Sequence, residues 1–251
     1  MRLPQELVDA IIDCFGIPYA QAATEKGDSH PPGSQGGGDD LKSLALVSRA
    51  CNHRARSHLF ANYRIYTLDS IKRLDQYPDL LLGYARTLTI AQCYRTPAST
   101  TFLPILRRFV SSPLVSIAFH FLRVPEELPE ILKSSFPNIR RIDVLSSSLS
   151  PSVLLNLVGT LERVHDLRLR RCRLSRATEG DNRPPSLPPL RGRLYISDPH
   201  SAIVGLLSQI PLPLRSLCYT SRVFPPEKKI IDACSGSLEN LEVRILVDLG
   251  G

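Results

Sequence analysis

The sequence predicts an α/β protein in which a small module of three helices is followed by a solenoid of strand and helix repeats around one curved parallel sheet. Three observations support this prediction: helical periodicity near the N-terminus, a short apolar strand motif that recurs along the rest of the chain, and a helical segment in each interval between motifs. Of the 251 residues, 43% are hydrophobic and 22% are charged, as in soluble globular proteins. We therefore expect two units, the module in residues 1–65 and the solenoid in residues 66–251.

The first predicted element is an amphipathic helix over residues 3–15. Leu3, Leu7 and Ile11 recur at a spacing that places them on one face of a helix. Pro4 is compatible with this helix because backbone nitrogens of the first turn have no intrahelical partner. The apolar face must pack against the rest of the module or against a partner.

Residues 16–40 separate this helix from the next one. They are rich in Gly, Pro, Ser and acidic residues and cannot bury enough apolar surface to offset the entropy of ordering, so we expect a flexible loop. Helical periodicity returns at Leu41, with Asp39 or Asp40 as the expected N-cap. A third short helix is expected from Ala50 to Phe60.

The module also carries a family resemblance. The opening Leu-Pro-Gln-Glu-Leu at residues 3–7, the centre Leu-Ala-Leu-Val-Ser-Arg at residues 44–49, and the closing Ala-Arg and Leu-Phe pairs within residues 55–60 resemble the F-box of fungal F-box proteins. The match covers about a quarter of the chain. It departs from the family pattern in the length of the loop over residues 16–40 and at Cys51, where the family commonly has an aromatic residue.

The resemblance implies that the module docks onto the Skp-type adaptor, and through it a cullin, of an SCF-type ubiquitin ligase. The solenoid would then bind an unknown protein substrate, and the protein would be a substrate-recognition subunit whose own chemistry is binding. A scaffold that uses the module without directing degradation is an alternative that the sequence leaves open. The positions implied as adaptor contacts are Leu3, Pro4, Leu7, Ile11, Leu44, Leu46, Val47 and Phe60.

Beyond residue 65, two apolar residues flanking a third residue recur about every 25 residues, a period within the range of leucine-rich repeats. One strand and one helix per interval cannot bury their apolar faces alone, so neighbouring repeats must stack. We expect an irregular leucine-rich-repeat-like solenoid without the Asn/Cys ladder of the commonest type; an ordinary compact α/β domain is the alternative. The motifs are Leu88-Thr89-Ile90, Ile117-Ala118-Phe119, Ile142-Asp143-Val144, Leu167-Arg168-Leu169, Leu194-Tyr195-Ile196, Leu217-Cys218-Tyr219 and Leu241-Glu242-Val243.

Helix start signals lie between the motifs. Ser150 and Pro151 precede one apolar stripe, Asp198 and Pro199 precede another, and a further helical segment begins at Thr101. A helix after each strand returns the chain to the start of the next parallel strand. We therefore expect the helices to lie outside the sheet.

The last motif lies close to Gly251. A stack of repeats normally needs a polar cap on its last apolar face. We therefore expect a shortened form of a longer repeat protein, in preference to an edge covered by self-association or an unstable edge. We also expect flexibility near Gly251 and in the loop over residues 175–188, which is rich in Pro and charge.

Side chains alternate across a strand, so the residues between and beside the apolar pairs must point to the concave face. The densest charge there is the run Leu-Arg-Leu-Arg-Arg-Cys-Arg at residues 167–173. Guanidinium groups on neighbouring strands suit bidentate binding of carboxylates or of a phosphorylated segment; a solvated basic face is the alternative. The candidate substrate-binding residues are Arg141, Asp143, Arg168, Arg170, Arg193 and Tyr195.

Composition argues against several other functions. The net charge of +7 would suit nucleic acid, but Arg is spread along the chain and aromatic residues are few, so a nucleic-acid-binding repeat protein ranks below the two protein-binding alternatives. The Cys and His residues show no metal-ligand spacing, and no catalytic motif occurs, so we expect no metal, no cofactor and no enzymatic activity. Without a signal peptide or membrane-spanning run, we expect a cytoplasmic or nuclear protein with no membrane partner.

Overall fold

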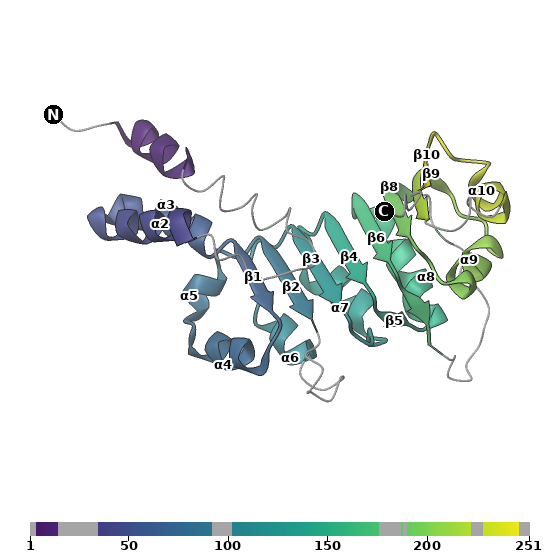
Figure 1. Ribbon diagram of the computed structural model, residues 1–251, viewed down its shortest axis with the longest axis horizontal. Helices are drawn as coiled ribbons and strands as arrows, with labels where there is room; N and C mark the ends of the chain where they lie inside the picture. The colour runs from purple at the N-terminus through teal and green to yellow at the C-terminus, as the bar shows by residue number, and fades with distance from the viewer. Residues whose placement is uncertain are drawn as a thin grey trace, which may run out of the picture.

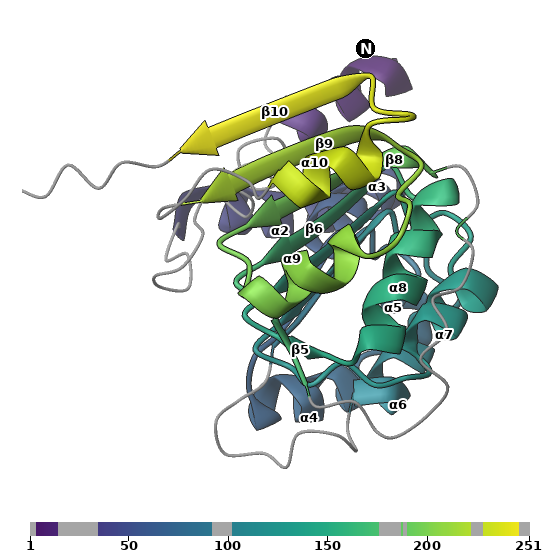
Figure 2. The same cartoon turned by 90° about the vertical axis from the view of Figure 1, so that its right-hand side faces the viewer.

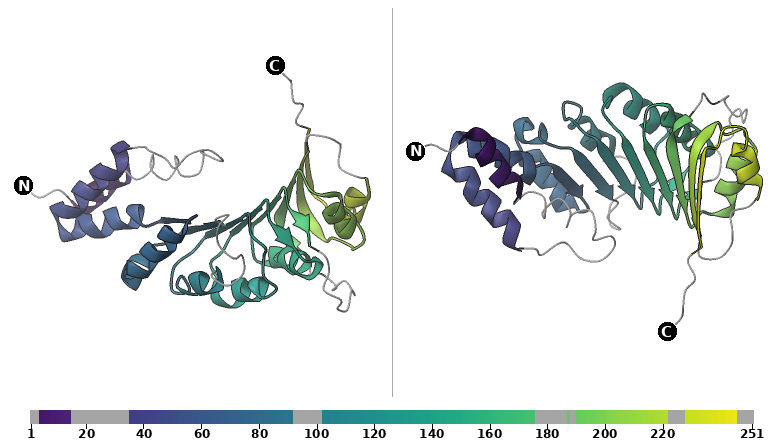
Figure 3. Two further views of the ribbon diagram at one scale, coloured as in Figure 1. Left: turned by 60° about the horizontal axis from the view of Figure 1, so that its bottom comes forward. Right: turned by 90° about the horizontal axis from the view of Figure 1, so that it is seen from above.

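The structure is a computed structural model that describes residues 4–14, 35–91, 102–175, 187, 190–221 and 228–245. Its main body is an eight-stranded sheet in the order β1-β2-β3-β4-β6-β8-β9-β10, and every neighbouring pair is parallel. Helices lie along one side of the curved sheet, and the N-terminal helices lie beyond its first strand (Figure 1, Figure 3). The predicted α/β class with a parallel sheet is confirmed.

Strands occur at all of the predicted motifs. In each neighbouring pair, the first apolar residue of one motif lies opposite the first apolar residue of the next, from Leu88 in β2 to Leu241 in β10. The repeat therefore predicts the pairing register as well as the strands. The sheet consists of β1 (Asn62–Ile65), β2 (Thr87–Ala91), β3 (Ser116–His120), β4 (Arg141–Leu145), β6 (Asp166–Arg170), β8 (Leu190–Ser197), β9 (Leu214–Ser221) and β10 (Asn240–Ile245).

The first strand of the sheet has no predicted motif. β1 is only four residues long and follows the last N-terminal helix almost at once, so its two apolar side chains give too short a pattern to distinguish from the end of that helix. Tyr63 and Ile65 are buried and pair with Leu88 and Ile90 of β2. β1 therefore connects the N-terminal helices to the sheet.

The helices between the strands cover the convex face of the sheet (Figure 2, Figure 3). Alternate strand residues, such as Leu167 and Leu169, are buried under these helices in one continuous hydrophobic core. Within the described ranges, every helix is too short or too polar to cross a membrane. The helices are α4 (Leu68–Gln76), α5 (Asp79–Leu82), α6 (Phe102–Arg107), α7 (Leu128–Ser135), α8 (Pro151–Gly159), the 3-10 helix η1 (Thr160–Glu162), α9 (Ser201–Ser208) and α10 (Lys228–Cys234), and the short strands β5 (Ser148–Leu149) and β7 (Arg173–Leu174) pair beside them.

The predicted helix starts are correct in part. Ser150 caps α8, because its hydroxyl accepts a hydrogen bond from the Val153 N–H at 3.2 Å. α9 begins later than expected and has His200 as its N-cap. The expected start at Asp198 and Pro199 is wrong because Asp198, with a φ of 44°, belongs to the turn that follows β8. α6 is present as expected, although Thr101 lies outside the described residues.

Four strands of the body end in the same turn. The residue after each strand has a positive φ, and its N–H donates a hydrogen bond to a carbonyl oxygen at the end of the following strand, for example Phe121 to Leu145 at 2.9 Å. This turn therefore extends the ladder of backbone hydrogen bonds by one residue beyond the strands. The turn residues are Phe121, Ser146, Arg171 and Asp198, with φ values of 58°, 48°, 52° and 44°.

Small polar side chains occupy the next position in two of these turns. Ser147 is buried and donates to the Leu145 carbonyl oxygen at 2.9 Å, and Cys172 is buried and donates to the Val144 carbonyl oxygen at 3.2 Å. Burial raises the pKa of the Cys172 thiol to about 11. Cys172 is therefore the one cysteine that bonds the backbone at this position of the described turns, and the absence of a regular Asn/Cys ladder stays a prediction.

The N-terminal module consists of a helix over residues 5–14, α2 (Gln35–Val47) and α3 (Arg49–Leu59). It has its own small core, distinct from the core under the sheet, with Ile12, Leu41, Cys51 and Ala55 buried at its centre. Cys51 is 8% exposed, so its thiol lies in the core. It occupies the position where the F-box family commonly has a larger aromatic ring. The three expected helices are present.

The boundary of the second helix differs from the prediction. α2 begins at Gln35, within the stretch of residues 16–40 expected to be a loop, so Asp39 and Asp40 lie inside the helix rather than at its N-cap. Three glycines in this turn lower helix propensity by about 1 kcal/mol each. Extending an existing helix is nevertheless much less costly than starting one. Leu41, which is buried in the module core, anchors α2 just after these glycines. The rest of the predicted loop lies outside the described residues, as do residues 176–186 and Gly251, where we expected flexibility.

Candidate protein-interaction surfaces

The N-terminal module exposes large apolar side chains at predicted adaptor contacts. Leu7 and Ile11 are 52% and 47% exposed, and Leu46 and Val47 at the end of α2 are 87% and 71% exposed. Pro4 is also exposed, and Leu3 lies outside the described residues. Leu7 and Ile11 lie one turn apart on the same helix face, whereas Ile12 faces the module core. We name Leu7, Ile11, Leu46 and Val47 the module surface.

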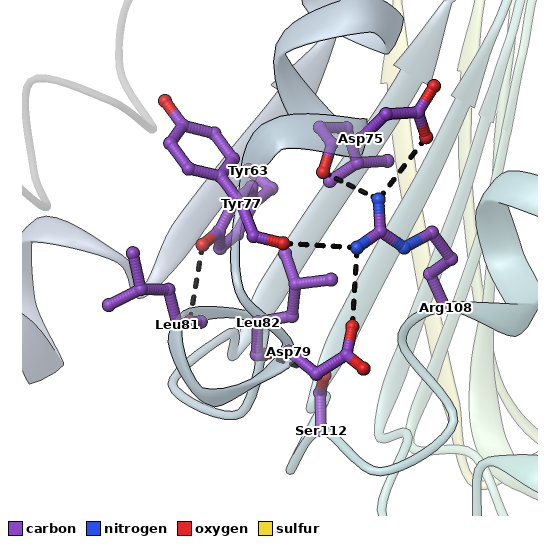
Figure 4. A network of polar contacts seen from close by, with 9 residues as sticks. Tyr63, Asp75, Tyr77, Asp79, Leu81, Leu82, Arg108 and Ser112 are labelled. Carbon is purple, nitrogen blue, oxygen red and sulfur yellow. Dashed lines mark hydrogen bonds and ion pairs between the residues drawn. The ribbon is translucent and has the colours of Figure 1, made fainter.

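Two other predicted adaptor contacts are placed differently. Leu44 is half-buried against the module core. Phe60 packs against the core under the sheet, with its ring centroid 6.5 Å from Tyr63 and 6.2 Å from Tyr77. The Tyr63 hydroxyl donates in turn to the Leu81 carbonyl oxygen at 3.2 Å (Figure 4). Phe60 therefore connects the module to the body and is not part of the module surface.

Arg108 holds together the part of the body on which the module rests (Figure 4). Its guanidinium donates to the carbonyl oxygens of Leu74 at 2.5 Å and Tyr77 at 3.1 Å. It also forms ion pairs with Asp75 at 3.3 Å and Asp79 at 3.2 Å. A planar donor group that reaches four acceptors fixes α4 and α5 against the end of α6.

Within the module, Asp13 fixes the first helix against α3. Its carboxylate accepts hydrogen bonds from the Arg54 guanidinium at 2.7 Å and 2.5 Å and contacts His58 Nε2 at 2.8 Å. The hydrogen bond from Arg54, with a smaller contribution from His58, lowers the pKa of Asp13 to about 2. This contact determines how Leu7 and Ile11, on the same helix as Asp13, are presented.

The concave face carries the predicted substrate-binding residues in register. Asp143 of β4, Arg168 of β6 and Tyr195 of β8 lie opposite one another, and the row continues with Cys218 and Glu242. Two further rows run parallel to it. One contains Arg141, Asp166 and Arg193, and the other contains Leu145, Arg170 and Ser197. The structure thus brings all six predicted residues together on three neighbouring strands.

Two of the four predicted arginines are paired with carboxylates on the same face. Arg170 binds Asp143 in bidentate fashion at 3.1 Å and 2.9 Å, and Arg141 lies 3.4 Å from Asp166. Asp166 is missing from the predicted set, although its position directly before an apolar pair, which it shares with Arg141, identifies it as a concave residue. The expected cluster of arginines is therefore a mixed network in which acidic residues separate the guanidinium groups.

Arg168 and Arg193 differ from the other concave arginines. Within the described part of the chain neither forms an ion pair, and the Arg168 guanidinium lies over the ring of Tyr195 at 5.8 Å from its centroid. A cation held over an aromatic face keeps its hydrogen-bond donors available. Arg168, Tyr195 and Arg193, which we name the concave triad, therefore offer positive charge beside an aromatic surface.

The row ends at a second charged group. The Glu242 carboxylate accepts a hydrogen bond from Arg244 at 2.7 Å, and this bond, followed by one from Cys218, lowers the pKa of Glu242. Burial, followed by the neighbouring Glu242, raises the pKa of the Cys218 thiol. Glu242 is thus occupied by two partners of the same chain.

A scan against protein-family models finds no match for this chain, and a search of curated proteins finds none either. In the described part of the chain, no group of three or more His, Cys, Asp or Glu side chains is placed to hold a metal ion. The module surface and the concave triad are therefore the features that bear on function.

Proposed function

We propose that the protein is a substrate-recognition subunit of an SCF-type ubiquitin ligase. The N-terminal module is an F-box that docks the Skp-type adaptor, and the repetitive body is an irregular leucine-rich-repeat-like solenoid that binds a protein substrate. The single observation that carries the proposal is the exposure of Leu7, Ile11, Leu46 and Val47 at positions where the F-box resemblance implies adaptor contacts. The proposal also depends on the resemblance of the module to the F-box.

The module surface offers enough apolar area to drive association with a partner. Burying one Leu, Ile or Val side chain is worth about 1.5–3 kcal/mol, so four exposed ones provide a substantial driving force for association. Large exposed apolar groups on a small helical unit are typical of a surface that another protein covers. The best-supported role of this surface is therefore the docking of a partner protein.

The concave triad supports a protein substrate more than a nucleic acid. Arg141 and Arg170 are engaged with carboxylates of the same face, which leaves few guanidinium groups to neutralise consecutive phosphates. Arg168 and Arg193 beside Tyr195 suit a peptide segment that carries an acidic residue and an apolar or aromatic one.

The test is co-expression of the chain with a Skp-type adaptor, followed by size-exclusion chromatography. We expect wild type to elute as a stoichiometric complex. Leu7→Asp and Leu46→Asp should each abolish it, because each places an unpaired charge in an apolar interface at a cost of several kcal/mol. Leu46 is almost fully exposed, so its substitution leaves the module core intact.

The matched control is Leu80→Asp, which makes the same substitution at an exposed leucine outside the module surface. Leu80 is 69% exposed on α5, outside the module, and its variant should retain the complex. Failure of folded wild-type protein to bind the adaptor would refute the proposal. Retention of the complex by both module variants would refute the assignment of the module surface.

A further inference from the structure

A basic hollow lies where the N-terminal module meets the body. Its floor is the corner between α2 and α3, and one wall is Tyr84, which precedes β2 in the body. No carboxylate is among the described residues that line it. The lining residues are Ala45, Leu46, Ser48, Arg49, Asn52, His53, Arg56 and Tyr84.

Helical spacing explains why basic groups gather here. Arg49, His53 and Arg56 follow one another at intervals of four and three residues along α3, which places them on one face of the helix. Ser48 caps this helix by accepting from the Cys51 N–H at 3.1 Å. Asn52 donates to the Ala45 carbonyl oxygen at 2.8 Å and so fixes the corner between the two helices.

The body closes the other side of the hollow. The Tyr84 hydroxyl is 2.9 Å from His53 Nδ1, and the two rings meet edge to face with centroids 5.4 Å apart. This contact joins residues that are far apart in the sequence and that belong to the module and to the body. A ligand in the hollow would therefore touch both units at once.

The arginines of α3 fall into two groups. Arg54, on the face toward the first helix, is satisfied by Asp13. Arg49 and Arg56 face the hollow and form no ion pair with any described residue. Guanidinium groups bind carboxylates in a planar, bidentate manner, so two such groups around a hollow without acid favour an anionic occupant.

We infer that this hollow receives an acidic segment of the same partner that covers the module surface. This inference rests on the proposed function, and it names the chemistry of that partner: carboxylates placed beside an apolar patch. Leu46 connects the two contacts, because it is both a wall of the hollow and the most exposed residue of the module surface. Tyr84 then extends the partner's footprint onto the body and helps to fix the angle at which the sheet is held.

The experiment measures the Kd of the purified chain for a purified Skp-type adaptor at low and high salt. The double variant Arg49→Glu/Arg56→Glu should raise the Kd about tenfold or more at low salt, because two ion pairs are lost and the reversed charges now repel the acidic segment. High salt should raise the Kd of wild type for the adaptor and reduce the ratio between the Kd values of the double variant and wild type.

The matched control is Lys72→Glu/Arg73→Glu, which makes the same change of charge at exposed positions on α4. This control should bind as wild type does. If the charge reversal impairs folding, judged by circular dichroism, Arg49→Gln/Arg56→Gln replaces it and should still raise the Kd severalfold.

The outcomes separate the inference from the proposed function. Equal Kd values for wild type, the double variant and the control would overturn the inference while leaving adaptor docking intact. A wild type that does not bind the adaptor would refute the proposed function, and with it this inference. Tight binding of a single-stranded oligonucleotide that depends on Arg49 and Arg56 and excludes the adaptor would also overturn the inference, by showing a nucleic acid as the occupant.

Discussion

At the scale of single residues, Gly192 is the position where packing leaves no space for a side chain. It lies in β8 at the register shift between Leu190 and Arg193. A Cβ atom there would lie 2.2 Å from the Val164 carbonyl oxygen and 2.6 Å from Leu161 Cδ2. The backbone carbonyl cannot move without disturbing the adjacent turn, so glycine is required by close approach and not by an unusual φ.

Gly192→Ala is therefore expected to lower the free energy of unfolding by about 1–3 kcal/mol. The measurement is chemical denaturation, with Gly205→Ala in α9 as the control. Apart from its chain neighbours and the backbone of its own helix, no atom lies within 4 Å of a Cβ at Gly205, and removing a helical glycine should raise stability by about 0.5–1 kcal/mol. Equal effects of the two substitutions would contradict the role assigned to Gly192.

The residues of the concave face could be predicted, but their pairing could not. Alternation along a strand assigns Asp143, Arg168 and Tyr195 to one face from the sequence alone. The choice of Asp143 as the partner of Arg170, and of Tyr195 as the partner of Arg168, depends on side-chain rotamers and on which strands are neighbours. The same limit applies to Tyr84, because no local pattern links it to His53.

At the scale of elements, strands were more predictable than helix ends. A pair of apolar residues in each repeat is fixed by burial on one face, so the seven motifs determine the strands and their register together. Helix ends depend on several competing backbone preferences. α2 extends through three glycines to Gln35, and α9 starts after the turn at Asp198, and neither is evident from propensity alone.

The docking of the first helix on α3 should depend on pH through Asp13. Its folded pKa of about 2 lies below the ordinary value of 3.8, so the contact stabilises the folded state fully above pH 3.8 and is lost as pH falls toward 2. In Asp13→Asn we expect lower stability at neutral pH and a weaker loss of stability between pH 4 and 2. Denaturant unfolding across this pH range measures both.

Asp40→Asn provides the matched control, because Asp40 is exposed on α2, whereas the ion pairs of Arg54 and His58 in the described part of the chain are with Asp13. It should keep the pH dependence of wild type. An Asp13→Asn profile that parallels wild type throughout would show that Asp13 does not secure the helix.

At the scale of the whole molecule, the module surface and the concave triad lie on separate parts of the chain. The module lies beyond β1, whereas Arg168 and Tyr195 lie in β6 and β8 farther along the sheet (Figure 1). Effects at sites this far apart, with no shared partner, are usually additive. Adaptor docking and substrate binding should therefore be separable by mutation.

The double variant Arg168→Glu/Arg193→Glu tests this separation. It should leave the Kd for the adaptor within about twofold of wild type, since it changes only the concave face. The measurement is the same adaptor titration used for the module. A large loss of adaptor affinity in a folded variant would mean that the partner reaches the concave face and that the two surfaces are one.

The order of the strands has a consequence for how such a molecule can change over evolution. Every strand of the large sheet pairs with its neighbour in chain order among the strands of that sheet, and from β2 to β10 the apolar motifs lie opposite one another. A duplicated unit of one strand and one helix would therefore insert between two neighbours without altering the connectivity of the others. Each added strand would contribute one more residue to every row of the concave face, and each lost strand would remove one. The binding surface of the body could thus change while the N-terminal module stays the same.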